Sequence, residues 1–152
     1  MPFDNITQSF GEWQERLNTL AEHSGLHSIL IMESKPDTME VVVANEQTIY
    51  NVGDCGPKSR QPGCHELYCE RVVDTAQPVF IPDASIDDEW KGNEDYVKFN
   101  LGVYLGFPLV NQGVVVGTIC ALNDKTFDFN EGSPSMCSEL VQLKNDIELA
   151  FS

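Results

Sequence analysis

Basic residues are scarce in this sequence. It has 9 lysines and arginines against 24 aspartates and glutamates, which gives a formal net charge of −15. The acidic residues are spread along the whole chain and are not gathered in a tail. Because a surface of this kind repels phosphate backbones and anionic lipid headgroups, we expect neither nucleic acid nor a membrane among the partners.

Long hydrophobic runs are also missing. No apolar stretch approaches the roughly 20 residues needed to cross a bilayer, and residues 1–13 have neither the basic flank nor the apolar core of a secretion signal. We therefore expect a cytoplasmic protein, in which thiols stay reduced. Its five cysteines, at positions 55, 64, 69, 120 and 137, lack the paired spacing of a disulfide framework.

Internal repeats are absent, and 152 residues fit one domain with a sizeable core. We expect residues 1–152 to form a single domain, with a helix within 1–24 and another within 133–152. A disulfide or a metal is not needed for a chain of this length to fold.

Apolar residues at three- and four-residue spacings predict these two long helices. The first stripe comprises Phe10, Trp13, Leu17 and Leu20 and ends at Ser24-Gly25, and the second, opened by Ser133-Pro134, comprises Met136, Leu140, Leu143, Ile147 and Phe151. A third helix is predicted over residues 64–76, with Tyr68, Cys69, Val72, Val73 and Ala76 on its inner face. A short irregular helical stretch is expected from Ser85, capped with Asp88, through Tyr96 and Phe99.

Short runs rich in β-branched residues predict strands at 28–32, 39–44 and 78–82 and a hairpin over 102–122, which turns at Asn111-Gln112-Gly113. Alternate residues of the last strand are apolar on both faces, so we expect both faces of the sheet to be covered. The fold class is therefore α/β (α+β). The polar segment 45–63 is a long loop, and a loop of this length in a compact domain is usually functional or mobile.

Four stretches of sequence, read in order, resemble one family. LYCERVV, PVFIPDASIDDEW, YLGFPLVNQGVVVGTICALNDK and ELVQLKNDIELAF, from about Leu67 to the C-terminus, resemble GAF domains, in particular the input modules of bacterial sensor histidine kinases and diguanylate cyclases. The resemblance implies a central antiparallel sheet with the terminal helices on one face and a small-molecule pocket on the other. It implies a sensory role without catalysis, in two-component or cyclic di-GMP signalling, and a homodimer formed by the terminal helices.

The pocket implied by the resemblance lies between the sheet and residues 64–76 and 83–101. We expect it to be lined by Tyr68, Asp83, Trp90, Tyr96, Phe99, Tyr104 and Cys120. We expect no metal and no tightly held cofactor, and an unknown small molecule as the ligand. Since one domain accounts for the 152 residues, the output is expected in a kinase or cyclase domain or in a partner protein.

The stretch GCHELYC, residues 63–69, suggests chemistry of its own. Cys64-His65 imitates a bilin attachment site, but in related photoreceptors the corresponding cysteine would fall near residues 91–93, where this chain has none. A zinc site using His65 and Cys69 would contain one ligand clip only, where closed sites usually have two. The nearby acids Asp83, Asp87, Asp88 and Glu89 match no calcium loop.

Two alternatives that use thiols remain. The Cys55 to Cys64 spacing is near that of two cysteines in GAF-type free methionine sulfoxide reductases, although the position of the catalytic thiol falls on Asn93. A thiol redox sensor would use Cys64, at the expected start of the helix over 64–76, with Cys55 as resolving partner. A purely structural dimerisation module is the third possibility.

Overall fold

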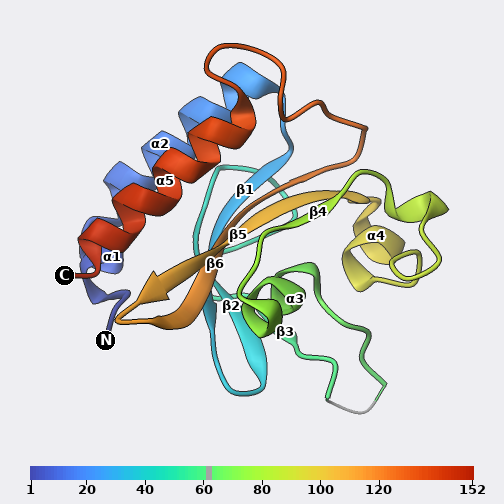
Figure 1. Ribbon diagram of the computed structural model, residues 1–152, viewed down its shortest axis with the longest axis horizontal. Helices are drawn as coiled ribbons and strands as arrows, with labels where there is room; N and C mark the ends of the chain where they lie inside the picture. Colours follow the sequence, from blue (N-terminus) through green and yellow to red (C-terminus); the bar gives the residue numbers. More distant parts are fainter. Residues whose placement is uncertain (61–62) are drawn as a thin grey trace.

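A six-stranded antiparallel sheet with helices on both faces organises the computed structural model, which describes residues 1–60 and 63–152 (Figure 1). The strands are β1 (Ser28–Ser34), β2 (Thr38–Ala44), β3 (Cys55–Pro57), β4 (Val79–Ile81), β5 (Val103–Asn111) and β6 (Val114–Asn123), in the order β3-β2-β1-β6-β5-β4. The helices are α1 (Asp4–Gln8), α2 (Phe10–Ser24), α3 (Tyr68–Thr75), α4 (Glu94–Phe99) and α5 (Met136–Ala150), with a 3₁₀ turn η1 (Ala84–Ile86). The predicted fold class is confirmed.

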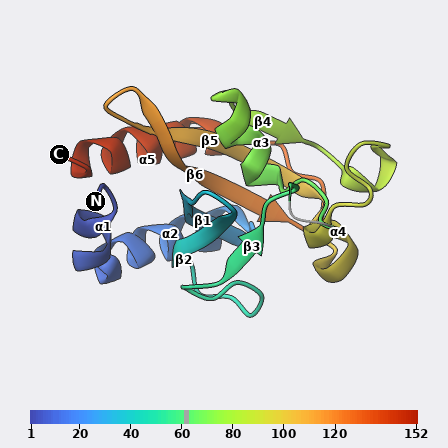
Figure 2. The same ribbon diagram turned by 90° about the horizontal axis from the view of Figure 1, so that it is seen from below.

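Two separate hydrophobic layers lie on the two faces of the sheet. On one face α2 lies over β1 and β2, and α5 lies over β5 and β6 (Figure 1). On the other face α3 packs against β5 and β6. Figure 1 shows α2 and α5 along one side of the molecule, and Figure 2 shows both chain ends together, beside α1 and the end of α5.

Strand alternation explains the two layers, because successive side chains point to opposite faces. In β6, Ile119 and Ala121 join the layer beneath α2 and α5, whereas Cys120 and Leu122 join the layer beneath α3. Most of β5 and β6 is buried, as the two-sided apolar pattern predicted, and only the hairpin end is more open. The hairpin turns at Gln112-Gly113, where both residues adopt positive φ, the geometry of the expected tight turn.

The structure corrects several predicted boundaries. The helix predicted over 64–76 begins only at Tyr68 and ends at Thr75. It begins there because the buried Glu70 carboxylate accepts a hydrogen bond from the Leu67 backbone N–H (3.0 Å) and so fixes the first turn. Ala76 lies in the left-handed region and is exposed, so it is not on the inner face. The last helix begins at Met136, not at Ser133-Pro134, because the Ser135 hydroxyl caps it by accepting from the Ser138 N–H.

Near Ser85 the predicted capping box with Asp88 does not form. Asp83 instead accepts from the Ser85 backbone N–H (3.0 Å) and supports the single turn η1. Strand β3 and helix α1 were not predicted. Among the described residues, no helix combines the length and the apolar character that crossing a membrane would require.

Candidate functional site

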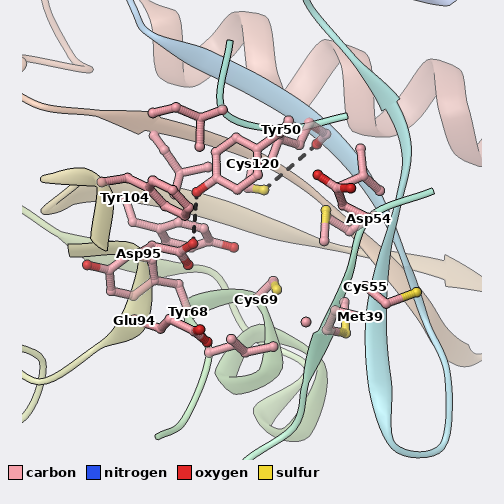
Figure 3. Close-up of a pocket in the computed structure, with 18 of the residues that line it drawn as sticks. Met39, Tyr50, Asp54, Cys55, Tyr68, Cys69, Glu94, Asp95, Tyr104 and Cys120 are labelled. Carbon is pink, nitrogen blue, oxygen red and sulfur yellow. Dashed lines mark hydrogen bonds between the residues drawn. The ribbon is translucent and has the colours of Figure 1, made fainter. Parts of the chain in front are cut away.

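A cavity of about 270 Å³ lies between the sheet and the segments that carry α3 and α4 (Figure 3). Strands β1, β2, β5 and β6 supply one wall, α3 and α4 two others, and the loop between β2 and β3 the fourth. The lining residues are Leu30, Met32, Met39, Val41, Ile49, Tyr50, Asp54, Cys55, Gly56, Pro57, Leu67, Tyr68, Cys69, Glu94, Asp95, Lys98, Phe99, Tyr104, Cys120 and Leu122. Most of this surface is apolar, with its charged groups concentrated on α4.

The sheet side of the cavity is built around Tyr104 on β5 and Cys120 on β6. Both side chains are almost completely buried. A Cβ atom at Gly106 would lie 2.2 Å from the Tyr104 hydroxyl oxygen, so glycine at this position leaves the space that the phenol occupies. The hydroxyl has no hydrogen-bond partner among the described residues, which is uncommon for a buried polar group.

Asp95 supplies the most unusual charge on the cavity wall. Its Oδ1 accepts a hydrogen bond from the Tyr50 hydroxyl (2.9 Å), and Figure 3 shows the carboxylate facing that hydroxyl. Burial raises the pKa of Asp95 from its ordinary value of 3.8 to about 6, although the Tyr50 hydrogen bond acts in the opposite direction. Burial likewise raises the pKa of Tyr50, and the neighbouring Asp95 raises it further.

Local hydrogen bonds hold Asp95 in this position. The buried Asn93 side chain accepts from the Asp95 backbone N–H (2.8 Å) and caps α4, while its own amide donates to the Glu66 carbonyl (2.9 Å). The Leu101 N–H donates to the Asp95 carbonyl oxygen at the other end of the helix. This short helix is therefore fixed both to the segment before α3 and to the start of β5.

The loop that carries Tyr50 is also held by side chains. The Gln47 side chain hydrogen-bonds to both the backbone N–H and the backbone C=O of Tyr50. The segment after β3 is held in a similar way, because Glu70 on α3 accepts from the Ser59 backbone N–H (2.9 Å) and hydroxyl. The buried Glu70 carboxylate thus joins the segment after β3 to the first turn of α3. The cavity walls come from segments far apart in sequence that are fastened by polar contacts.

A family model for the GAF domain matches residues 13–150. The chain belongs to the GAF family. No curated protein sequence matches it significantly, so the remaining similarities are to solved structures.

Three solved structures illustrate the similarity of fold. A type II free methionine-R-sulfoxide reductase from Thermoplasma acidophilum is 13% identical, with a TM-score of 0.67 over 97% of this chain and 95% of that one. The GAF domain of an Acinetobacter phosphoenolpyruvate-protein phosphotransferase is 16% identical, with a TM-score of 0.65 over 99% and 92%. A far-red cyanobacteriochrome photoreceptor is 14% identical, with a TM-score of 0.62 over 91% and 83%. At these identities the likeness shows the fold alone.

Four of the seven residues predicted for the pocket lie on the cavity of this GAF domain: Tyr68, Phe99, Tyr104 and Cys120. Asp83, Trp90 and Tyr96 do not lie on it. Asp83 is half-buried, and its carboxylate accepts from Ser85. Trp90 packs behind Tyr68, with ring centroids 5.3 Å apart, and under the Arg71 guanidinium. Tyr96 lies with Asp83 in a small hollow on the outer side of α4.

Five polar lining residues were not predicted from the sequence, namely Tyr50, Asp54, Glu94, Asp95 and Lys98, and of these Tyr50 and Asp95 hydrogen-bond to each other. Tyr50 comes from the long loop, for which function was expected in general terms only. Asp95 was one acid among 24 in the chain, and only its burial distinguishes it. An acid two residues after a helix-capping asparagine, on a segment expected to cover the pocket, was the available signal.

The cysteines are not arranged as the redox hypothesis required. Cys64 lies four residues before the first residue of α3, so the helix dipole cannot favour its thiolate as proposed. Cys55 is exposed on β3, and partial desolvation together with Glu40, which accepts its S–H (3.6 Å), raises its pKa. Cys69 and Cys120 line the cavity, and burial raises the pKa of both thiols, that of Cys120 to about 12.

Metal-ligating side chains do not gather in the described part of the chain. Within residues 1–60 and 63–152, no group of three or more histidine, cysteine, aspartate or glutamate side chains lies close enough to hold a metal ion. The bilin-like pair falls outside the cavity, since neither Cys64 nor His65 belongs to its lining. The chemistry that this site offers is therefore shape, apolar surface and a few hydrogen-bonding groups.

Proposed function

We propose that this GAF domain is a non-catalytic sensory module that binds a small molecule in its central cavity. The observation that supports the proposal is the cavity itself, about 270 Å³ with mostly apolar walls and a few polar groups. Its volume is near the lower end of the roughly 300–1,000 Å³ typical of ligand pockets, and its composition is typical of them. Similarity of fold to a photoreceptor adds support, since that protein is a sensor by its name.

The route of the signal would run from the cavity through the sheet to the terminal helices. Strands β5 and β6 contact the cavity on one face and α5 on the other. Lys144 on α5 donates to the Pro108 carbonyl and pairs with Glu148, whose carboxylate accepts from the Val110 N–H (2.7 Å). A ligand that binds one arrangement of strands and helices more tightly shifts the population toward it. The receiver would be a kinase or cyclase domain, or a partner protein, of a bacterial signalling system.

Native mass spectrometry of the purified protein tests ligand binding directly. We expect an added small-molecule mass on the wild type that is lost in Cys69→Met, because the longer side chain fills part of the cavity. Cys137→Met is the matched control, since Cys137 lies on α5 outside the cavity lining. A wild type without bound ligand, and without thermal stabilisation by any compound of a metabolite library, would contradict the proposal.

A thiol reductase is the second candidate, because a free methionine-R-sulfoxide reductase shares the fold and three cysteines, Cys55, Cys69 and Cys120, line the cavity. The raised pKa values of Cys69 and Cys120 oppose it, since the thiolate is the nucleophile. We expect no reduction of free methionine-R-sulfoxide with dithiothreitol as reductant. Turnover that disappears in Cys69→Ser or Cys120→Ser would replace the sensory proposal with the enzymatic one.

A further inference from the structure

The charged groups on the cavity wall are mostly acidic. Asp54, Glu94 and Asp95 line it together with one cation, Lys98, which forms an ion pair with Glu94 on the same helix. In the described ranges 1–60 and 63–152, no lysine, arginine or histidine forms an ion pair with Asp54 or Asp95. Asp54 is exposed and remains hydrated, so Asp95 carries the charge that is least compensated: Lys98 attracts it from a distance but forms its ion pair with Glu94.

The Asp95 carboxylate has an oxygen available for a ligand. Oδ1 accepts from the Tyr50 hydroxyl, whereas Oδ2 takes part in no hydrogen bond among the described residues. Among the described residues, the fully buried side-chain polar atoms that lack a partner are the hydroxyls of Tyr104 and Thr118. Oδ2 of Asp95 is not one of them, so it is not fully buried. An ionised carboxylate in apolar surroundings is costly unless it is paired with a cation and hydrogen-bonded.

A second observation, independent of the acids, points to a hydrogen-bonding ligand. The Tyr104 residue is 1% exposed and lines the cavity, and its hydroxyl has no partner among the described residues. A hydroxyl oxygen can accept from an N–H group. Aromatic rings stand nearby, since Tyr50 and Phe99 meet edge to face with centroids 6.3 Å apart, and ring faces attract cations.

We propose that the cavity binds a small organic cation, an amine with an apolar body, whose ammonium group pairs with the Asp95 carboxylate. This inference rests on the proposed function, because it names the chemical class of ligand for the same cavity. The apolar body lies against the methionine and aliphatic side chains of β1 and β2, chiefly Met32, Met39 and Val41. An anionic ligand finds no unpaired cation on this wall among the described residues, because Lys98 is already paired.

The test compares three matched series of compounds on the same protein: straight-chain and phenyl-substituted primary amines, the corresponding alcohols, and the corresponding carboxylates. Thermal shift selects the binders, and isothermal titration calorimetry measures their affinities. We expect amines to bind at least tenfold more tightly than the alcohols of the same length, and carboxylates not to bind. In Asp95→Asn the preference for amines disappears while the alcohols bind as before.

The matched control is Asp88→Asn, which removes one negative charge from a side chain that is 98% exposed. It retains the preference for amines, which separates the local ion pair from the general attraction of an acidic protein for cations. Amine binding should also weaken about tenfold from pH 7 to pH 5, as Asp95 takes up a proton. The other titratable groups on the cavity wall are Tyr50, Asp54, Cys55, Tyr68, Cys69, Glu94, Lys98, Tyr104 and Cys120.

Binding of carboxylates or alcohols in preference to amines would overturn the amine proposal and leave the sensory function standing. An equal preference for amines in the wild type and in Asp95→Asn would also overturn it, because the ion pair would then have no role. If no compound of the three series binds, the amine class is wrong. The proposed function is decided separately by the mass of the purified wild type and of Cys69→Met.

Discussion

At the scale of single residues, ionisation of Asp95 has opposite effects on folding and on binding. The ionised carboxylate lowers the stability of the folded protein, but it is the form that would pair with an amine. The pKa of Asp95 is raised on folding, so the folded protein holds the proton more tightly than the unfolded chain. Stability contributed by this group is therefore present below about pH 4 and lost as the pH rises to about 6. A shift of about two pKa units corresponds to roughly 3 kcal/mol as an upper figure.

We predict that Asp95→Asn is more stable than the wild type at pH 7.5, by about 1 to 3 kcal/mol, because the buried charge is removed. The difference should shrink as the pH falls and vanish near pH 3, below the ordinary pKa of 3.8, where both states of the wild type are mostly protonated. Urea unfolding at the two pH values measures it, with Asp88→Asn expected within about 0.5 kcal/mol of the wild type at both. A destabilised Asp95→Asn at pH 7.5 would contradict the assignment of a strained charge.

Glu70 is the opposite kind of buried acid, because its carboxylate is fully used. It accepts from the Ser59 backbone N–H and hydroxyl and from the Leu67 backbone N–H. We predict that Glu70→Ala costs about 2 to 3 kcal/mol, since three donors, including the N–H of the buried Leu67, lose their acceptor together. Hydrogen exchange should rise at the Ser59 and Leu67 amides, whereas Glu66→Ala, which removes a partner of Arg71 nearer the surface, should leave those amides protected.

At the scale of secondary-structure elements, α5 is fastened to the sheet and to α2 by two different ion pairs. Lys144 and Glu148, 22% and 24% exposed, also hydrogen-bond to the backbone of β5, whereas Arg16 and Asp146, 43% and 31% exposed, join the outer sides of α2 and α5. A pair that satisfies backbone groups and is partly buried contributes more than a surface pair.

We predict that Lys144→Met lowers the free energy of unfolding by about 1 to 2 kcal/mol, because Glu148 and the Pro108 carbonyl lose their donor. Arg16→Met is the matched substitution at the exposed pair and should cost less than about 1 kcal/mol. Chemical denaturation of both variants makes the comparison. Equal losses in the two would show that the backbone contacts of Lys144 and Glu148 add nothing to stability.

The elements themselves were largely predictable from sequence, whereas the cavity was not. Periodic apolar residues predict α2, α5 and the β5–β6 hairpin because burial on a sheet imposes those periods. The start of α3 was misplaced because it depends on Glu70 accepting the Leu67 N–H, a contact that apolar periodicity does not register. Tyr104 and Cys120 follow from strand alternation. The meeting of Tyr50 with Asp95 joins residues 45 positions apart, and no local pattern predicts that contact.

At the scale of the whole molecule, the terminal helices form one outer layer with both chain ends beside it (Figure 1). The Asn5 side chain donates to the Ala150 carbonyl (2.9 Å), which ties the two ends together. Few large apolar side chains project from this layer, among them Leu149 at 74% and Val141 at 37% exposure on α5. Acidic residues outnumber basic ones on both helices. The homodimer proposed for GAF input modules would bring these like charges together.

We predict a homodimer through α2 and α5 whose affinity rises with salt, because screening lengths fall from about 10 Å at 0.1 M to about 3 Å at 1 M ionic strength. Leu149→Asp should weaken it at least tenfold by adding a charge to its apolar contact. Val97→Asp is the matched control, since Val97 is 66% exposed on α4, across the sheet from the helix layer. Sedimentation equilibrium at the two ionic strengths measures these constants. A monomer at every concentration and ionic strength, or equal weakening by both substitutions, would contradict an interface formed by the terminal helices. The signal would then have to leave the domain along the chain itself.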